Sequence, residues 1–368
     1  MHDLGKAELD AVAEVFANPI LTTGVWVERF ERRFADYLKV RNAVGVTSCT
    51  GALHLALLAL GIGPGDEVIT TPMTFIATAT AIMEAGAKPV FIDVEPETGN
   101  LDTSKIEAAL TERTRAIMPV HLYGQMCDMR AVRTIADSYG LKVIEDAAHC
   151  VEGTRDGVRT GELGDAACYS FYATKNLTCG EGGALVTNDD EMAAQVRLLR
   201  LHGMNKNAND RHREGYKHWD MTAMGWKYNM DNIQAALLLP QMDRLDENWR
   251  KRRELAEYYE KQLWDIPGLS RPKTLPQVEH AWHLFPVWIG DGKRDHVISE
   301  LQRAGVGVMV NYRAIHLLTY FKETYGFKPG DFPVAESIGD ASLSLPFYPS
   351  MPLEHVDRVI EVLRDSLH

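Results

Sequence analysis

The sequence predicts an α/β protein with a mostly parallel sheet and a second, smaller α+β domain. Between about residues 44 and 186, short β-rich runs alternate with segments of helical periodicity, a pattern that implies crossover connections between parallel strands. After Asp189 the composition changes, and strand and helix patterns return towards the C-terminus. A length of 368 residues favours two domains at about 150 residues each. We expect a large domain over residues 1–240 and a small one over 241–368.

Seven apolar runs predict the strands of the large sheet. They are Val44–Thr47, Glu67–Thr71, Pro89–Asp93, Ala116–Val120, Lys142–Asp146, Ala167–Phe171 and Ala184–Thr187. Helical patterns lie between the early runs, at Thr50–Leu60, Phe75–Ala85, Ser104–Leu110 and Met129–Tyr139. Because a parallel sheet is buried on both faces, helices must cover both of them.

The chain beyond the sheet predicts a helix at Asp190–Leu201 and a polar loop at Asn205–Lys217. A long helix follows from about Asp231 to Leu263, and Pro240 is expected to kink it or divide it in two. The elements expected in the small domain are a strand near Trp282–Ile289, a helix near Asp295–Ala304, a strand near Gly307–Asn311 and a final helix at Leu353–Ser366.

Composition excludes several classes of partner. The net charge is −12, and an acidic chain without a long basic run is a poor candidate for binding nucleic acid. The five cysteines are widely spaced, which argues against a disulfide framework or a zinc site and fits a reducing cytoplasm. No signal-peptide pattern opens the chain, and apolar stretches such as Ala52–Ile62 are too short to span a bilayer. We expect a cytoplasmic protein with no metal, nucleic-acid or membrane partner.

The first segment with chemical potential is Ser48-Cys49-Thr50-Gly51-Ala52-Leu53-His54, which turns from a strand into a helix. Small residues there let backbone N–H groups approach an anion at the helix N-terminus. The Thr50 hydroxyl can add a hydrogen bond. A plain helix N-cap is the alternative interpretation.

The second segment is Val143–His149, an apolar strand that ends in the carboxylate of Asp146. Open parallel sheets bind ligands at the carboxyl ends of their strands. An aspartate at that place can pair with a buried cationic ring nitrogen, and a helix cap is the alternative.

The third segment is Tyr169–Leu177, with Gly180-Glu181-Gly182-Gly183 behind it. Lys175 follows a buried strand here. In a desolvated pocket the pKa of a lysine falls from about 10.4, so that its amine becomes a usable nucleophile; the alternative is a surface lysine. An amine, a phosphate cradle and an aspartate for a ring nitrogen are together what pyridoxal 5′-phosphate (PLP) requires.

At these residues the sequence resembles the DegT/DnrJ/StrS family of sugar-nucleotide aminotransferases, from about Leu21 to the end of the chain. The motifs that carry the resemblance are Glu145-Asp146-Ala147-Ala148-His149, Ser170-Phe171-x-x-x-Lys175, Lys227-Tyr228-Asn229-Met230-Asp231, Asn311–His316 and Ser344–Tyr348. The family has the aspartate-aminotransferase-like fold (PLP fold type I). Lys175-Asn176-Leu177-Thr178-Cys179 looks most similar to the branch that makes UDP-4-amino-4-deoxy-L-arabinose and related 4-amino sugars.

The resemblance implies catalytic roles for two residues. Lys175 would form the Schiff base with PLP and then act as general acid and base. Asp146 would pair with the pyridine nitrogen and keep it protonated. Phe75 would stack on one face of the ring, and His149 would lie at its other side or near the 3′-oxygen.

The resemblance also implies how the phosphate is held. Thr50, Gly51 and Ser170 would bind it within one subunit. Asn229 would reach the phosphate of the neighbouring subunit, so the active protein would be a homodimer with shared active sites.

For the substrates, the resemblance places Tyr312 and His316 at the sugar nucleotide. Arg211 and Arg213, in the polar loop, are candidates for the diphosphate or for the carboxylate of the amino donor; a solvated loop is the alternative. His54 is expected to be a packed or capping histidine.

The implied reaction is transamination of a nucleotide-linked keto sugar, with L-glutamate leaving as 2-oxoglutarate. A 4-keto sugar on UDP or dTDP is favoured. Some relatives are dehydratases, with histidine in place of the lysine or with the lysine kept, and some bind PLP or sugar nucleotides as regulators without turnover. Lys175 favours transamination over the dehydratases with histidine, and dehydratases that keep the lysine remain an alternative. The intact set Lys175, Asp146 and Ser170 argues against a regulator without turnover. The glycine run Gly61–Asp66 precedes its strand, whereas a dinucleotide-binding fingerprint follows one, so a dehydrogenase is excluded.

Overall fold

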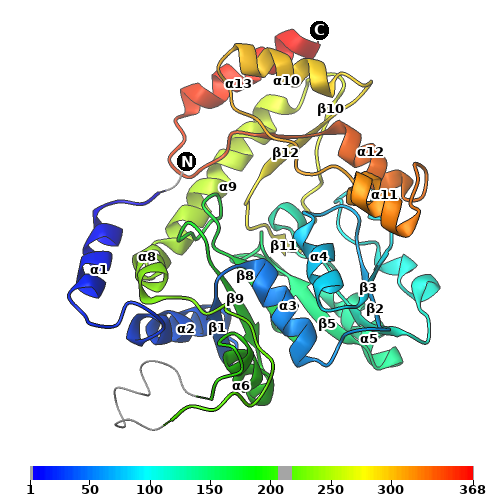
Figure 1. The fold of residues 1–368 in the computed structure, drawn as a ribbon. Coiled ribbons are helices and arrows are strands. Elements are labelled where there is room, and N and C mark those ends of the chain that lie inside the picture. Colours follow the sequence, from blue (N-terminus) through cyan, green and yellow to red (C-terminus); the bar gives the residue numbers. More distant parts are fainter. Residues whose placement is uncertain (1–2, 206–217, 368) are drawn as a thin grey trace.

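The centre of the protein is a seven-stranded sheet, seen in a computed structural model that describes residues 3–205 and 218–367. Its strands are β1 (Asn42–Val46), β2 (Glu67–Thr70), β3 (Lys88–Phe91), β4 (Thr114–Ile117), β5 (Lys142–Asp146), β8 (Ala166–Ser170) and β9 (Gly183–Thr187). They lie in the order β1-β9-β8-β5-β4-β2-β3 (Figure 1). Among these strands β9 alone runs against the others, pairing antiparallel with β1 and β8. The predicted mostly parallel sheet is confirmed, and each predicted run overlaps one strand.

Helices cover both faces of this sheet, as predicted. The helices are α1 (Lys6–Phe16), α2 (Val25–Leu38), α3 (Cys49–Ala59), α4 (Ala77–Glu84), α5 (Met129–Tyr139), α6 (Asp190–Leu199) and α8 (Asn232–Met242). Strand residues alternate between the two cores, because successive side chains of a strand point to opposite faces. In β8, Ala166 and Cys168 pack with α3, α4 and α6, whereas Ala167 and Tyr169 pack with α2 and α8. The helix α5 covers the second face over β4 and β5.

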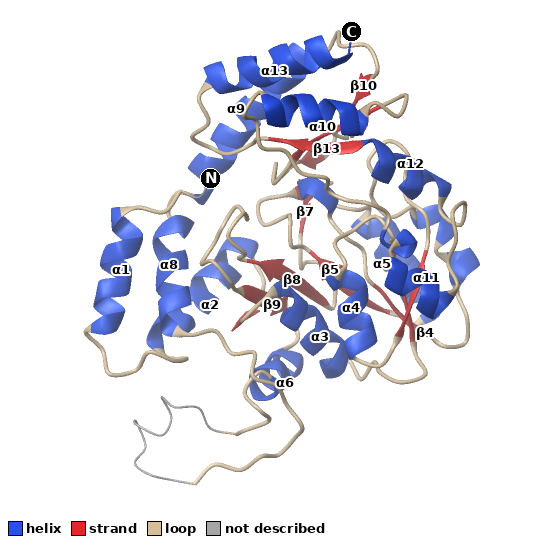
Figure 2. Cartoon of the chain, turned by 45° about the horizontal axis from the view of Figure 1, so that its top comes forward, coloured by secondary structure: helices blue, strands red, loops and turns tan. Residues whose placement is uncertain are grey.

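The C-terminal part builds a smaller α+β unit at the end of the molecule that carries the C-terminus (Figure 2). Its three-stranded sheet has the order β10-β12-β13, with β10 at Leu269–Ser270, β12 at Phe285–Ile289 and β13 at Ser342–Leu345. One hydrophobic core joins this sheet to α9 (Leu245–Leu263), α10 (Arg294–Arg303) and α13 (Leu353–Leu367).

The remaining described elements are short. They are the strands β6 (Thr154–Arg155), β7 (Val158–Arg159) and β11 (Val278–Glu279), the helices α11 (Thr319–Tyr325) and α12 (Pro333–Ala341), and the 3-10 turns η1 (Thr103–Lys105), η2 (Glu107–Ala109), η3 (Leu122–Gly124) and η4 (Ile315–Leu317). The strand β11 pairs with β6, so a C-terminal segment extends a small sheet that starts in the N-terminal half.

Two predicted elements were wrong, and a third prediction was confirmed. The segment predicted as a helix at Ser104–Leu110 forms the 3-10 turns η1 and η2, in which each amide donates to the carbonyl three residues earlier, as from Ile106 to Thr103 and from Leu110 to Glu107. The strand expected at 307–311 is only a single bridge between Met309 and Ser344. The expected division of the long helix is confirmed: α8 ends at Met242, two residues after Pro240, and α9 begins at Leu245.

The helix α2 is an addition that the prediction lacked. It buries large side chains spaced four residues apart, Trp26, Phe30, Phe34 and Leu38, against the second face of the sheet. All five cysteines are buried and unpaired. Within residues 3–205 and 218–367, no helix is both long and apolar enough to cross a bilayer. The domain boundary at residue 240 stays a prediction, and it falls within α8.

Candidate active site

A cavity of about 940 Å³ opens at the carboxyl ends of β5 and β8. These strands are parallel neighbours, so their terminal residues, Asp146 and Ser170, reach the same edge of the sheet. The segments around Tyr312 and Tyr348 close the opposite wall. The volume lies at the upper end of the range for small-molecule sites, about 300–1,000 Å³, so the cavity can hold a cofactor and a substrate together.

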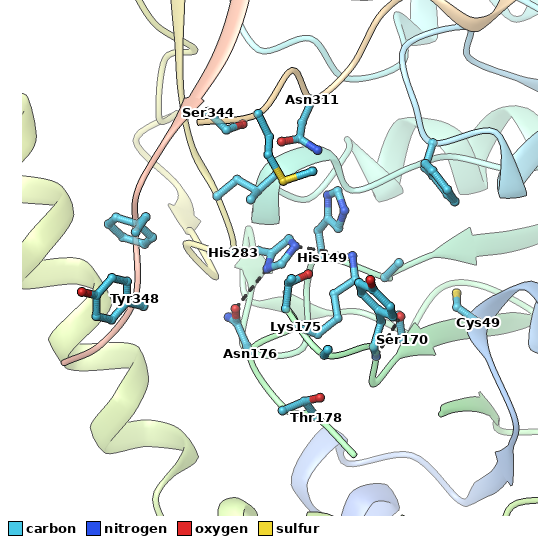
Figure 3. Close-up of a pocket in the computed structure, with 18 of the residues that line it drawn as sticks. Cys49, His149, Ser170, Lys175, Asn176, Thr178, His283, Asn311, Ser344 and Tyr348 are labelled. Atoms are coloured by element: carbon cyan, nitrogen blue, oxygen red, sulfur yellow. Dashed lines mark hydrogen bonds between the residues drawn. The ribbon is translucent and has the colours of Figure 1, made fainter. Parts of the chain in front are cut away.

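Lys175 points into this cavity from the turn after β8 (Figure 3). Its amide donates a hydrogen bond to the Tyr172 carbonyl at 2.9 Å. Burial lowers the pKa of its amine to about 8, against the opposing negative charge of Asp146. A substantial fraction of the amine is therefore neutral near physiological pH, as a nucleophile requires.

Asp146 offers a buried carboxylate to the same cavity. It accepts hydrogen bonds from the Thr78 hydroxyl at 2.7 Å and from the Ala148 amide at 3.2 Å. Burial raises its pKa, although both hydrogen bonds and the charge of Lys175 lower it. Because a desolvated carboxylate is stabilised by a nearby cation, Asp146 is suited to a protonated ring nitrogen.

His149, Tyr312 and Phe75 meet at one side of the cavity. The Tyr123 amide donates to His149 Nδ1 at 3.2 Å, which leaves the Nε2 proton facing the Tyr312 hydroxyl at 3.1 Å. The Phe75 ring lies 6.0 Å from the Tyr312 ring and is 56% exposed, so it has open space on one face. The structure thus brings these three predicted residues together.

The start of α3 supports both interpretations of the first motif. The Ser48 hydroxyl accepts a hydrogen bond from the Gly51 amide at 3.0 Å and caps the helix. Thr50 and Ser170 line the cavity, whereas Gly51 is not among its described lining residues. A Cβ at Gly51 would lie 3.3 Å from the Tyr228 ring, so this glycine lets the start of α3 lie close to that ring. Phosphate binding by the three residues stays a prediction.

Other predicted residues lie elsewhere. Neither Asn229 nor His316 is among the described residues that line the cavity. The Asn229 amide donates to the Thr23 hydroxyl at 2.8 Å, and His316 is fully buried, with Nε2 3.0 Å from the Glu336 carboxylate. Arg211 and Arg213 fall outside the described residues. The predicted roles of these four residues stay predictions.

His54 is packed, as predicted. It is 1% exposed, with its ring edge on Trp226 at 5.0 Å.

Sequence reasoning missed two residues that contact the predicted pair. Thr78, which binds Asp146, follows Thr74 by one helical turn, and their hydroxyls are 2.7 Å apart. The four-residue spacing of the two threonines is a local pattern from which Thr78 could have been identified. His283 Nε2 lies 3.4 Å from the Lys175 amine across 108 residues of sequence, and no local pattern could have revealed it.

The chemistry of these side chains fits PLP. The cavity holds an amine of lowered pKa at Lys175 and a buried carboxylate at Asp146. The hydroxyls of Thr50 and Ser170 line it as well. These groups match the covalent, ring-nitrogen and phosphate attachments that PLP needs.

Comparison with known proteins agrees with this site. The family model for the DegT/DnrJ/EryC1/StrS aminotransferase family matches residues 2–364. The spore coat polysaccharide biosynthesis protein SpsC of Bacillus subtilis is 45% identical over 368 residues, covering 98% of this chain and 95% of that protein. GDP-perosamine synthase of Caulobacter vibrioides is 40% identical, covering 95% and 92%. A pleiotropic regulatory protein of Geobacillus stearothermophilus is also 40% identical, covering 96% and 92%.

Solved structures match the fold closely. DesV of S. venezuelae is 38% identical with a TM-score of 0.89, covering 97% of this chain and 93% of that one. The PLP form of the putative sugar aminotransferase Spr1654 from Streptococcus pneumoniae is 29% identical with a TM-score of 0.92, covering 99% and 96%. These neighbours make PLP the expected cofactor of the cavity.

Proposed function

Because the chain belongs to the DegT/DnrJ/EryC1/StrS aminotransferase family and is thus a PLP-dependent transaminase, we propose that it transfers the amino group of L-glutamate to a nucleotide-linked keto sugar. The products are an amino-sugar nucleotide and 2-oxoglutarate. One observation supports this most directly: the amine of Lys175 and the carboxylate of Asp146 share one buried cavity at the carboxyl ends of β5 and β8.

The residues of the cavity divide the work. When bound, PLP supplies an electron sink for the carbon that carries the amino group. In our proposal Lys175 attaches the cofactor and then takes up and returns the proton at that carbon. Asp146 keeps a proton on the ring nitrogen, while Phe75 and His149 flank the ring.

Hydroxyl groups hold the cofactor's other end. We assign Thr50 and Ser170 to the phosphate, with the Gly51 backbone allowing the close approach of α3. Asn229 serves the site of the neighbouring subunit, which makes the working unit a homodimer.

The proposed acceptor is a 4-keto sugar on UDP or dTDP, of the kind used by the UDP-4-amino-4-deoxy-L-arabinose branch. The names of two relatives, a GDP-perosamine synthase and a spore coat polysaccharide protein, support a nucleotide sugar destined for a glycan. The first name adds GDP to the nucleotides worth testing. Tyr312, His316 and Arg211 are the proposed substrate contacts, and the cytoplasm is the proposed compartment.

The test is the absorption spectrum of the purified, PLP-loaded protein before and after L-glutamate. We expect the long-wavelength band of the bound aldehyde form to convert to the shorter-wavelength amine form. Adding 4-keto sugars on UDP, dTDP and GDP one at a time should restore the first band only with the true acceptor. The Lys175→Ala variant is the control and should turn over several orders of magnitude more slowly.

A regulatory role is the second candidate, favoured by the 40% identical relative named as a pleiotropic regulatory protein. A PLP band that L-glutamate leaves unchanged, with sugar nucleotides bound but not converted, would favour it. A dehydrated sugar product without any consumption of glutamate would indicate a dehydratase instead.

A further inference from the structure

The side chains behind Lys175 form a chain of hydrogen bonds with a defined direction. The Lys175 amine lies 3.4 Å from His283 Nε2, and His283 Nδ1 lies 3.3 Å from the Asn176 amide oxygen, Oδ1 (Figure 3). The Asn176 amide nitrogen donates in turn to the Ala281 carbonyl at 2.9 Å and to both oxygens of Glu152, at 3.1 and 3.0 Å.

The orientation of Asn176 follows from its partners. A backbone carbonyl can only accept hydrogen bonds, so the group that faces Ala281 must be the amide nitrogen. Burial raises the pKa of Glu152 to about 7, so its charge varies near neutrality. The contact to Ala281 fixes the amide whether Glu152 is charged or not. The Asn176 oxygen therefore always faces His283.

This orientation fixes the protonation of His283. An amide oxygen only accepts, so His283 must carry its proton on Nδ1. Burial keeps the imidazole neutral by holding its pKa well below the ordinary value, and the positive charges of Lys175 and Arg252 add to this. A neutral ring has one N–H, so Nε2 is left with a lone pair directed at Lys175.

We propose that Asn176 holds His283 in its Nδ1-protonated tautomer, so that His283 accepts a hydrogen bond from the Lys175 amine and leaves the lone pair of that amine free. In the opposite tautomer His283 would donate a proton into that lone pair and block it. His283 and Asn176 are thus positioning residues that act through Lys175. The inference rests on the proposed role of Lys175 in the transamination.

Two neighbouring histidines have the opposite tautomer and serve as internal references. His149 Nδ1 accepts from the Tyr123 amide at 3.2 Å, and His280 Nδ1 accepts from the Trp282 amide at 2.8 Å. As neutral rings, both carry their proton on Nε2. Of these three buried histidines, His283 alone should carry it on Nδ1.

The first experiment reads the tautomer directly, by ¹⁵N–¹H correlation of the histidine-labelled, cofactor-free protein. The His283 signals are identified by their loss in His283→Gln. We expect a neutral ring protonated on Nδ1 for His283 and on Nε2 for His149 and His280. A His283 ring protonated on Nε2, or doubly protonated at pH 7, would overturn the proposal. This readout needs neither turnover nor bound cofactor.

The second experiment measures how fast the cofactor-free protein captures PLP covalently. Asn176→Ala removes the acceptor for the Nδ1 proton and should slow capture about tenfold or more, with the His283 proton shifted to Nε2. His283→Gln can still donate to Asn176 and accept from Lys175, so it should retain most of the rate. His54→Gln, in another buried histidine that is not among the described lining residues of the cavity, is the matched control and should match the wild type.

Two outcomes distinguish a failure of this inference from a failure of the proposed function. If Lys175→Ala still captures PLP in the cavity, the proposed attachment residue is wrong, whatever the tautomer. If Lys175→Ala loses capture but Asn176→Ala keeps both the Nδ1 proton and the full rate, the tautomer proposal alone fails.

Discussion

Glu145 and Asp146 are consecutive residues at the end of β5, and their carboxylates have different partners. Glu145 is fully buried on the side away from the cavity, where it accepts hydrogen bonds from the amides of Gly161 at 3.1 Å and Gly164 at 2.9 Å. It also pairs with His121 at 2.8 Å. Asp146 points the other way, into the cavity. Because side chains alternate along a strand, neighbouring acids in one motif serve the core and the site separately.

This division predicts that one of two matched substitutions mainly affects stability and the other mainly affects the reaction. Glu145→Gln should lower the free energy of unfolding by about 2 kcal/mol, since it weakens several hydrogen bonds to a buried charge. Asp146→Asn should cost less than about 1 kcal/mol of stability yet lose the glutamate half-reaction. Urea unfolding and the absorption assay measure the two quantities. Equal stability losses in both variants would contradict the division.

The lowered pKa of Lys175 predicts a specific pH profile. Since its amine is protonated below a pKa of about 8, the rate of covalent PLP capture should rise about tenfold per pH unit up to that value and then level off. With an ordinary lysine, the capture rate would keep rising up to a pH of about 10.4. The cofactor-free protein is assayed from pH 6 to 10, with Lys175→Ala as the background. A profile that still climbs above pH 9 would mean that the amine is not desolvated.

At the scale of elements, the start of α3 is set by its contact with β9. Gly183, the first residue of β9, lies so close to the helix that a Cβ there would be 2.4 Å from the Ser48 carbonyl carbon and 2.6 Å from the Cys49 amide nitrogen. The strand therefore holds the helix N-terminus against the mouth of the cavity, where Thr50 is exposed to the ligand space.

Gly183→Ala should displace this helix start. We expect a stability loss of about 1–3 kcal/mol from overpacking. The affinity for PLP should be at least about tenfold weaker, because the backbone amides at the start of α3 move together with Thr50. The control is Gly63→Ala, whose added Cβ would meet nothing closer than 3.4 Å. The PLP dissociation constant and urea unfolding are measured for both. A normal PLP affinity in Gly183→Ala would remove α3 from the phosphate site.

At the scale of the whole molecule, the cavity takes residues from both ends of the chain, from Asp3 to Pro349. The small C-terminal unit thus supplies a wall of the site, through Tyr312 and Tyr348, in addition to its own core. Besides Gly51, Asn229 is the proposed cofactor residue that is not among the described lining residues of the cavity, and its side chain is bound to Thr23 in its own chain. Its proposed partner lies in a second copy.

Asn229→Ala tests this arrangement. We expect PLP to dissociate faster from the dimer, with little change in the glutamate reaction at saturating PLP. Thr23→Val removes the contact to Asn229 within the chain and leaves the Asn229 side chain in place, so it is the matched control. Cofactor loss on gel filtration, with mass determination, measures both. A fully active monomer would contradict the shared site.

The sequence by itself determined the large sheet, the amine and the acid. Strand alternation, helical periodicity and the residues at strand ends are local properties, so Lys175 and Asp146 could be recognised from their immediate neighbours. The prediction was wrong in two places: residues 104–110 form 3-10 turns with bonds to the third residue back, and among the described residues the segment 307–311 pairs through a single bridge, from Met309 to Ser344.

Only the tertiary structure decided what surrounds these residues. Thr78 reaches Asp146 across 68 residues of sequence, and His283 reaches Lys175 across 108. Their contacts depend on how crossovers and the C-terminal unit pack on the sheet, which no spacing within one segment encodes. In our proposal the same packing places the proton of His283 on Nδ1, through its contact with Asn176. The chemical group of a side chain follows from its identity in the sequence. Its orientation and protonation depend on residues distant in the sequence, because those hydrogen bonds form only when the chain folds.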